Sequence, residues 1–263
     1  MVNDKQLSWV RKWFELYTGE FCTGNERIDS AICLKVRHTN NVEREIVQLT
    51  DSLSMSREER YLAQICAILH DIGRFEQYAR YHTFSDLRSE NHAAIGLRVI
   101  EKFGVLRGFF SEDEDLISSV VLNHNRAYLP KSDNSRFIHF LKLVRDADKL
   151  DILHMMTDYY EGAHVSEVVC VGLPDQPAIS KEILKSIVTG EIGRTEHMKT
   201  RNDFKLLQIS WIFDFNFAWS FSVIDSKRYI DRIGSVLPQT ESVTAALNSA
   251  HKFLKERCGE ERR

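Results

Sequence analysis

The chain has 263 residues, of which 43% are hydrophobic, so it is long and apolar enough to build one large domain with a substantial core. Charged residues make up 28% and the net charge is only -3, which excludes the strongly basic surface typical of proteins that bind nucleic-acid polymers or anionic membranes. The N-terminus starts polar, and no run of about 18 apolar residues occurs. We therefore expect a cytoplasmic protein that does not enter a membrane.

Apolar residues recur at spacings of three and four along most of the chain, which predicts helices. The first predicted helix carries an apolar stripe of Trp9, Val10, Trp13, Phe14 and Tyr17. The second carries a stripe of Ala31, Leu34, His38, Val42, Ile46 and Leu49, which places His38 on an apolar face.

A third helix begins after Ser56, because Glu59 follows at the capping-box distance. We expect it to run into His70 and Asp71 and to end at Gly73. Residues 75–91 show no sustained period and are predicted to form a loop. Helices are predicted over 92–103, over a segment that reaches His124, and over 137–153.

The second half of the chain gives a weaker pattern. Residues 162–177 suggest a loop, 181–189 a short helix, and the remainder is predicted to be helical from about Phe204. Aromatic residues alternate with period two from Trp211 to Phe221, which alone favours a strand. We predict a helix there, since a lone strand in a helical chain would have no partner.

Four of the ten histidines, His38, His70, His92 and His124, fall on helix faces that are otherwise apolar. A single buried histidine is more often a core residue than a ligand, but four of them together with the adjacent Asp71 indicate a metal site. Because consecutive helical residues project about 100° apart, His70 and Asp71 can reach one ion between them.

Further ligands must come from other helices, and His38 and Asp148 are suitable. A set of imidazoles and carboxylates favours a divalent transition metal such as Mn, Fe, Co, Ni or Zn over Ca. His92 and His124 could complete a second ion, with Asp71 bridging the two. Two ions about 3.5–4 Å apart are the usual arrangement for in-line displacement at phosphorus.

Three segments resemble the HD superfamily of metal-dependent phosphohydrolases: HTNNV from His38, HDIGRF from His70, and VRDADKLD over 144–151. The resemblance covers residues 25–160, and the histidines at 92 and 124 are similar to those of HD proteins that hold two metals. It implies that the closing ligand is Asp148, which precedes Lys149, with Asp146 as the fallback.

The predicted fold is all-α: a multi-helix HD-domain bundle with a helical C-terminal extension packed on it. We expect one domain over residues 1–263, with the HD core at about 25–160 and the extension at about 178–258.

Catalytic roles are assigned to Asp71, Arg74 and Lys149, and substrate contacts to Arg74, Lys149 and Arg145. Arg74 lies one turn beyond His70, where a guanidinium could hold phosphoryl oxygens. The alternatives are a surface ion pair of Arg74 with Glu76 or Asp86, and a solvated helix face for the bases at 142, 145 and 149.

The predicted function is hydrolysis of a phosphomonoester or nucleotide by a metal-activated water, with one or two ions as cofactor. The expected partner is a small phosphorylated substrate, and a homo-oligomer is compatible with the sequence. Two alternatives stay open: a di-iron HD-type oxygenase of a small hydroxylated substrate, and a non-catalytic nucleotide-sensing module.

Overall fold

The computed structural model describes residues 2–162 and 172–260. Within these ranges the regular elements are helices and no strand occurs, which confirms the all-α class. The chain divides into two compact units, Met1–Asp151 and Ile152–Arg263, which are described one at a time. The expectation of a single domain, with an extension packed on the HD core, stays a prediction.

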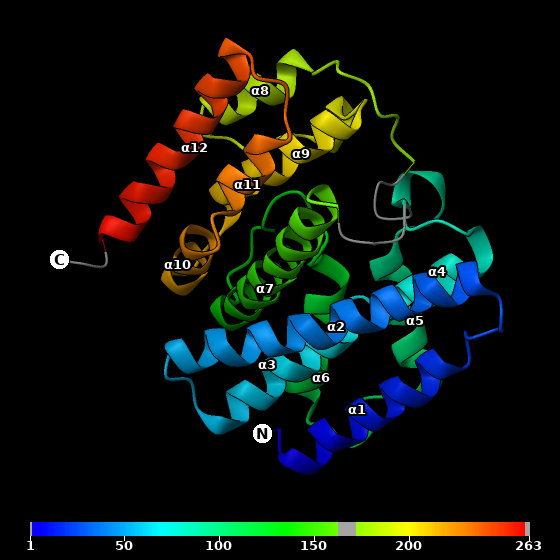
Figure 1. The fold of residues 1–263 in the computed structure, drawn as a ribbon. Helices are drawn as coiled ribbons and strands as arrows, with labels where there is room; N and C mark the ends of the chain where they lie inside the picture. Colours follow the sequence, from blue (N-terminus) through cyan, green and yellow to red (C-terminus); the bar gives the residue numbers. More distant parts are fainter. Residues whose placement is uncertain (1, 163–171, 261–263) are drawn as a thin grey trace. The chain divides into compact units, whose positions relative to one another are not determined.

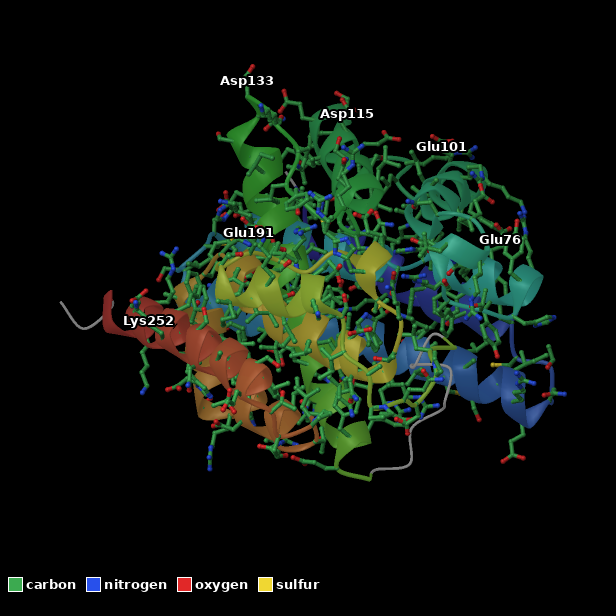
Figure 2. All side chains as sticks on the ribbon, turned by 90° about the horizontal axis from the view of Figure 1, so that it is seen from above. Glu76, Glu101, Asp115, Asp133, Glu191 and Lys252 are labelled. Atoms are coloured by element: carbon green, nitrogen blue, oxygen red, sulfur yellow. The ribbon has the colours of Figure 1, made fainter. Side chains whose placement is uncertain are left out.

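The first unit contains every residue proposed for the site. Its elements are α1 (Asp4–Gly19), α2 (Glu26–Ser52), α3 (Arg57–Leu69), α4 (Gly73–Tyr81), the 3-10 turn η1 (Asp86–Arg88), α5 (His92–Phe103), α6 (Ser111–Asn123) and the part of α7 (Ser135–Tyr160) that ends at Asp151 (Figure 1). Helix α3 packs against α1, α2 and α6, and α4 packs against α2 and α5. Acidic side chains such as Glu101, Asp115 and Asp133 point outward (Figure 2).

The predicted apolar face of α2 and the predicted start of α3 are confirmed. All six residues of the α2 stripe, His38 included, are buried. Ser56 caps α3 in a capping box with Glu59. The α1 stripe is wrong at one position, because Trp9 is 50% exposed. Trp9 projects about 100° away from Val10, and its indole donates to the carbonyl of Val105 at 3.1 Å.

The predicted loop over 75–91 is wrong in its first half, where α4 forms. The buried face of α4 contains Phe75, Tyr78 and a polar residue, Gln77. The side-chain amide of Gln77 donates to Asp86, to Ser89 and to the carbonyl of Glu90, at 2.8–2.9 Å. Hydrophobic periodicity overlooks this helix because a hydrogen-bonded glutamine occupies a core position.

Gly73 begins α4, so the prediction that it terminates the preceding helix is also wrong. A Cβ at this position would lie 2.1 Å from the carbonyl oxygen of His92 and 2.5 Å from the amide nitrogen of Gly96. The absence of a side chain thus lets α4 touch the first turn of α5, where His92 is located.

The second unit consists of the end of α7 from Ile152 and a set of shorter elements. These are α8 (Lys181–Val188), η3 (Thr195–His197), α9 (Arg201–Ser210), η4 (Trp211–Asp214), α10 (Ala218–Ser226), α11 (Tyr229–Ser235) and α12 (Glu241–Glu260). Helix α12 packs against α8 and α10. The predicted helix over 181–189 is confirmed by α8, whereas most of the predicted loop over 162–177 lies outside the described residues.

The alternating aromatic segment forms no strand, but the predicted helix is interrupted. The 3-10 turn η4 covers 211–214, residues 215–217 are not helical, and α10 follows. The period of two therefore spans three different backbone conformations. Phe215 and Phe221 are buried and their rings lie 6.3 Å apart.

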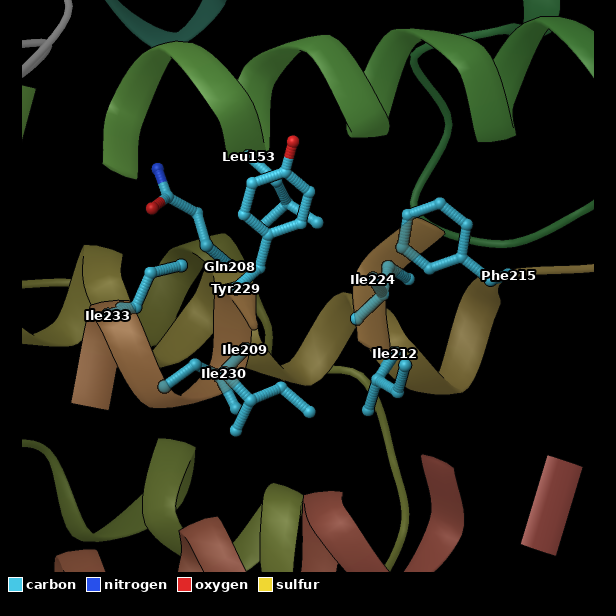
Figure 3. A pocket seen from close by; sticks show the side chains of 9 residues that line it. All are labelled: Leu153, Gln208, Ile209, Ile212, Phe215, Ile224, Tyr229, Ile230 and Ile233. Carbon is cyan, nitrogen blue, oxygen red and sulfur yellow. The ribbon is translucent and has the colours of Figure 1, made fainter. Parts of the chain in front are cut away.

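One cavity of this unit, of about 10 Å³, lies among apolar side chains of α7 and α9–α11 and is just large enough for one water molecule (Figure 3). It is lined by Leu153, Gln208, Ile209, Ile212, Phe215, Ile224, Tyr229, Ile230 and Ile233. A cavity this small is a packing feature and has no room for a substrate. Among the described helices, none has the length and hydropathy needed to span a membrane.

The close approach at Gly73 predicts that Gly73→Ala destabilises the protein by about 1–3 kcal/mol, because the added methyl group meets backbone atoms that cannot rotate away. Urea unfolding followed by circular dichroism measures this change. Gly19→Ala is the matched control, since a Cβ there meets nothing within 4 Å. Equal stability of Gly73→Ala and the wild type would contradict the packing described for α4 and α5.

Candidate metal centre

The structure brings together all six residues predicted as metal ligands. His38 and Asp148 come from α2 and α7, and His92 is the first residue of α5. His70 and Asp71 lie in the turn between α3 and α4, and His124 directly follows α6. Five of the six are buried, and the side chain of Asp148 is 20% exposed. The site therefore reaches solvent beside Asp148.

Two groups of three residues place one potential ligand atom each within 4.8 Å of one another. The first ligand group is His38, His70 and Asp148, and the second ligand group is His70, Asp71 and His124. In the first, Oδ1 of Asp148 lies 3.1 Å from Nε2 of His38 and 3.7 Å from Nε2 of His70. His70 belongs to both groups.

The carboxylate of Asp71 lies between the two sides of the site. Its Oδ2 faces Nε2 of His38 at 3.6 Å and Nε2 of His70 at 3.8 Å. Its Oδ1 faces Nε2 of His92 at 3.1 Å and Nε2 of His124 at 3.6 Å. One oxygen is thus directed to each side, which is the arrangement required of a bridging ligand.

Each of the four imidazoles has its Nδ1 next to a hydrogen-bond acceptor. Nδ1 of His38 lies 2.7 Å from Asp151, and Nδ1 of His92 lies 2.8 Å from Asp86. Nδ1 of His70 and of His124 lie 2.6 Å and 2.8 Å from the carbonyls three residues earlier, those of Ala67 and Val121. These contacts hold the proton on Nδ1 and leave Nε2 as the ligand atom, as in most histidine metal sites.

The donor set fits a divalent cation. Nε2 of His70 is fully buried and has no hydrogen-bond partner among the described residues, a state that is costly unless a cation or a polar group meets it. Nε2 of His92 and Nε2 of His124 lie 3.0 Å apart. Imidazole and carboxylate ligands suit Mn, Fe, Co, Ni or Zn.

Electrostatics at the site favour anionic carboxylates. Burial acts to raise the pKa of Asp71, but Lys35 and Arg74 outweigh it and hold this pKa well below its usual value. The pKa of Asp148 is likewise held low against burial by the imidazoles of His38 and His70, which lie beside its carboxylate.

The pKa values of His38 and His124 shift in opposite directions. Burial and Lys35 lower the pKa of His38, yet hydrogen bonds to Asp148 and Asp151 raise it to about 9. Burial lowers the pKa of His124 to about 4, helped by the charges of His92 and His70 and opposed by Asp71. Without a bound cation, a proton on His38 offsets part of the negative charge.

The sequence did not identify Lys35, Asn41 and Asp151 as functional residues, although all three lie at the site. Lys35, one turn before His38, places its Nζ 2.8 Å from Oδ2 of Asp71. Asp151 accepts from Asn41 at 2.9 Å in addition to contacting His38. The spacing of 35, 38 and 41 on α2 is the signal that could have identified two of them, because residues three apart share a helix face.

The three basic residues predicted to act in catalysis or to contact substrate, Arg74, Lys149 and Arg145, lie in different surroundings. Nε of Arg74 is 3.3 Å from Asp71, and its Nη1 is 3.0 Å from Asp86, so the ion pair considered as an alternative forms beside the ligands. Lys149 is partly buried and follows Asp148. Arg145 is buried and donates to the carbonyls of His124, at 3.0 Å, and of Arg126.

The assigned roles of Asp71, Arg74, Lys149 and Arg145 stay predictions. The contacts of Arg145 account for the position of His124, and they leave its predicted role as a substrate contact without support from the geometry.

The raised pKa of His38 predicts that binding of Mn²⁺ becomes tighter as the pH increases. Below about pH 9 an ion must displace the proton of His38, and each displaced proton makes the apparent affinity rise about tenfold per pH unit. His124 is already neutral above about pH 4 and adds nothing to the slope. Chelator-competition titrations at pH 6.5, 7.5 and 8.5 measure the effect, and an affinity independent of pH would contradict this assignment.

Comparison with known proteins gives one match. The family model described as HD domain matches residues 36–153, a range inside the 25–160 predicted from the motifs. No curated protein and no solved structure matched significantly. The matched range contains all six proposed ligands. Residues 36–153 of this chain are therefore an HD domain.

Proposed function

We propose that this protein is a metal-dependent hydrolase of phosphomonoesters or nucleotides, with water as the nucleophile. The observation that supports it best is the position of Asp71, whose two oxygens are directed to separate sets of histidines. A phosphate ester is the substrate class that an HD domain implies.

His38, His70 and Asp148 would hold one ion, His92 and His124 a second, and Asp71 would be a ligand of both. Divalent ions at these positions would supply Lewis acidity toward a phosphoryl oxygen and would lower the pKa of a water molecule. Of the six proposed ligands, Asp148 is the one whose side chain is not buried, so substrate would approach beside it.

Cationic side chains of the chain would bind the phosphoryl group. Lys35 and Arg74 each contact a different oxygen of Asp71, and both side chains retain about 15% exposure. If bound cations compensate the charge of Asp71, the ammonium of Lys35 would be available to a substrate oxygen. Lys149, next to Asp148, would add positive charge at the open side.

The same ligands also suit the alternative di-iron oxygenase, because four imidazoles with two carboxylates are a good environment for iron. A nucleotide-sensing module is less well supported, since all six ligand positions are filled and lie together. We therefore place hydrolysis first.

Replacing a central ligand should abolish function. His70→Ala and Asp71→Ala are expected to lose bound metal and at least about 100-fold of phosphatase activity, since removing a residue that only orients a ligand already costs 10–100-fold. Metal content is measured by mass spectrometry of purified protein, and activity by phosphate release from a panel of phosphomonoesters and nucleotides. His139→Ala, on α7 and outside both ligand groups, is the matched control. Full metal content and full activity in both ligand variants would refute the proposal.

The choice of reaction predicts a response to oxygen. Phosphate release with Mn²⁺ should proceed at the same rate with and without oxygen, because hydrolysis changes no oxidation state. Turnover that consumes oxygen with Fe²⁺ and fails with Mn²⁺, measured with an oxygen electrode, would instead establish the oxygenase.

A further inference from the structure

We infer that Asp86 is a positioning residue that sets the affinity of the second ion through His92 and at the same time fixes the guanidinium of Arg74. This inference rests on the proposed two-ion site. Asp86 lies in η1, between α4 and α5, and its side chain is 30% exposed. Of the six proposed ligands, it contacts His92, through the imidazole and the backbone amide.

Donors from three parts of the first unit converge on this carboxylate. Nδ1 of His92 lies 2.9 Å from Oδ1 and 2.8 Å from Oδ2. From α4, Nη1 of Arg74 donates to Oδ1 at 3.0 Å, and Nε2 of Gln77 donates to it at 2.8 Å. Nδ2 of Asn125, just after His124, donates to Oδ2 at 3.2 Å.

Every one of these neighbours is a donor, so the position requires a group that only accepts. An ionised carboxylate offers about four lone-pair sites on two oxygens, enough for the four side-chain donors, and the backbone amide of His92 also donates to Oδ1, at 3.4 Å. An asparagine would present an NH₂ group to at least one of them. The carboxylate of Asp86 therefore accepts hydrogen bonds from neighbours that an amide side chain could not all satisfy.

The effect on His92 follows from its two ring nitrogens. With Nδ1 donating to Asp86, Nε2 is left as the ligand atom, 3.1 Å from Oδ1 of Asp71. A carboxylate partner also makes the imidazole a stronger ligand. The same carboxylate holds Arg74, whose Nε lies 3.3 Å from Oδ1 of Asp71. One residue therefore aligns two neighbours of the bridging ligand.

Asp151 provides an internal comparison on the opposite side of the site. It contacts Nδ1 of His38 at 2.7 Å, as Asp86 contacts Nδ1 of His92. His70 and His124 use backbone carbonyls instead. Among the four ligand histidines, His38 and His92 are the two paired with a carboxylate, one for each proposed ion. Changes at Asp86 and Asp151 should therefore affect different ions.

The test is a Mn²⁺ titration of the metal-free full chain. For Asp86→Asn we expect the second ion to bind about 10–100-fold more weakly while the first keeps its affinity. Asp151→Asn should weaken the first ion. Asp113→Asn is the matched control, because Asp113 is a buried carboxylate that pairs with Arg136 and belongs to neither ligand group.

A double-mutant cycle separates positioning from general damage. In a His92→Ala background, Asp86→Asn should change Mn²⁺ affinity by less than about twofold, because its route to the ion is already removed. If Asp86→Asn does not fold, Asp86→Glu keeps the charge and displaces it by one methylene, and it should show the same selective loss of the second ion.

Ion content separates this inference from the proposed reaction. Unchanged affinities in Asp86→Asn, equal weakening of both ions, or a wild type that binds at most one ion would overturn the role of Asp86. A wild type that binds two ions, loses the second in Asp86→Asn and yet hydrolyses no phosphate ester would leave the role of Asp86 intact and reject the hydrolase.

Discussion

The carboxylate of Asp71 is the constraint around which the first unit is organised. It is buried, it contacts Lys35 and Arg74, and each of its oxygens faces two imidazole nitrogens. Burying such a charge is costly unless cations or hydrogen bonds compensate for it. The helices supply these partners from α2, α4, α5 and the end of α6, and the close contact at Gly73 lets α4 and α5 approach closely enough for His92 to reach Asp71.

Residues that form hydrogen bonds with the proposed ligands fix the positions of the ligand side chains. Acceptors next to Nδ1 fix all four imidazoles, two through carboxylates and two through carbonyls of the preceding helical turn. Arg145 holds the segment that carries His124, and Gln77 ties α4 to the segment before α5. A ligand set aligned in this way loses little freedom when a cation binds, which supports metal-dependent chemistry as the use of this site.

The sequence predicts the ligands better than it predicts their supports. His38, His70, His92 and His124 could be found because each interrupts an apolar face, and Asp148 could be chosen from the motif around it. Helix α4 and Gln77 were missed because a buried, hydrogen-bonded amide looks like a solvated residue in a hydropathy pattern. Asp86 was considered only as an ion-pair partner of Arg74, and Asp151 only as part of an inward stripe. Their contacts with His92 and His38 join residues that are 6 and 113 positions apart, and such separations produce no recognisable spacing in the sequence.

We propose that Asp71 is a ligand shared by two cations. Anomalous diffraction from crystals of the protein grown with Mn²⁺ measures this directly. We expect two anomalous peaks about 3.5–4 Å apart, one beside His38, His70 and Asp148 and the other beside His92 and His124, with an oxygen of Asp71 on each. Crystals that show Mn²⁺ bound elsewhere, or a single peak that Asp71 does not ligate, would contradict it.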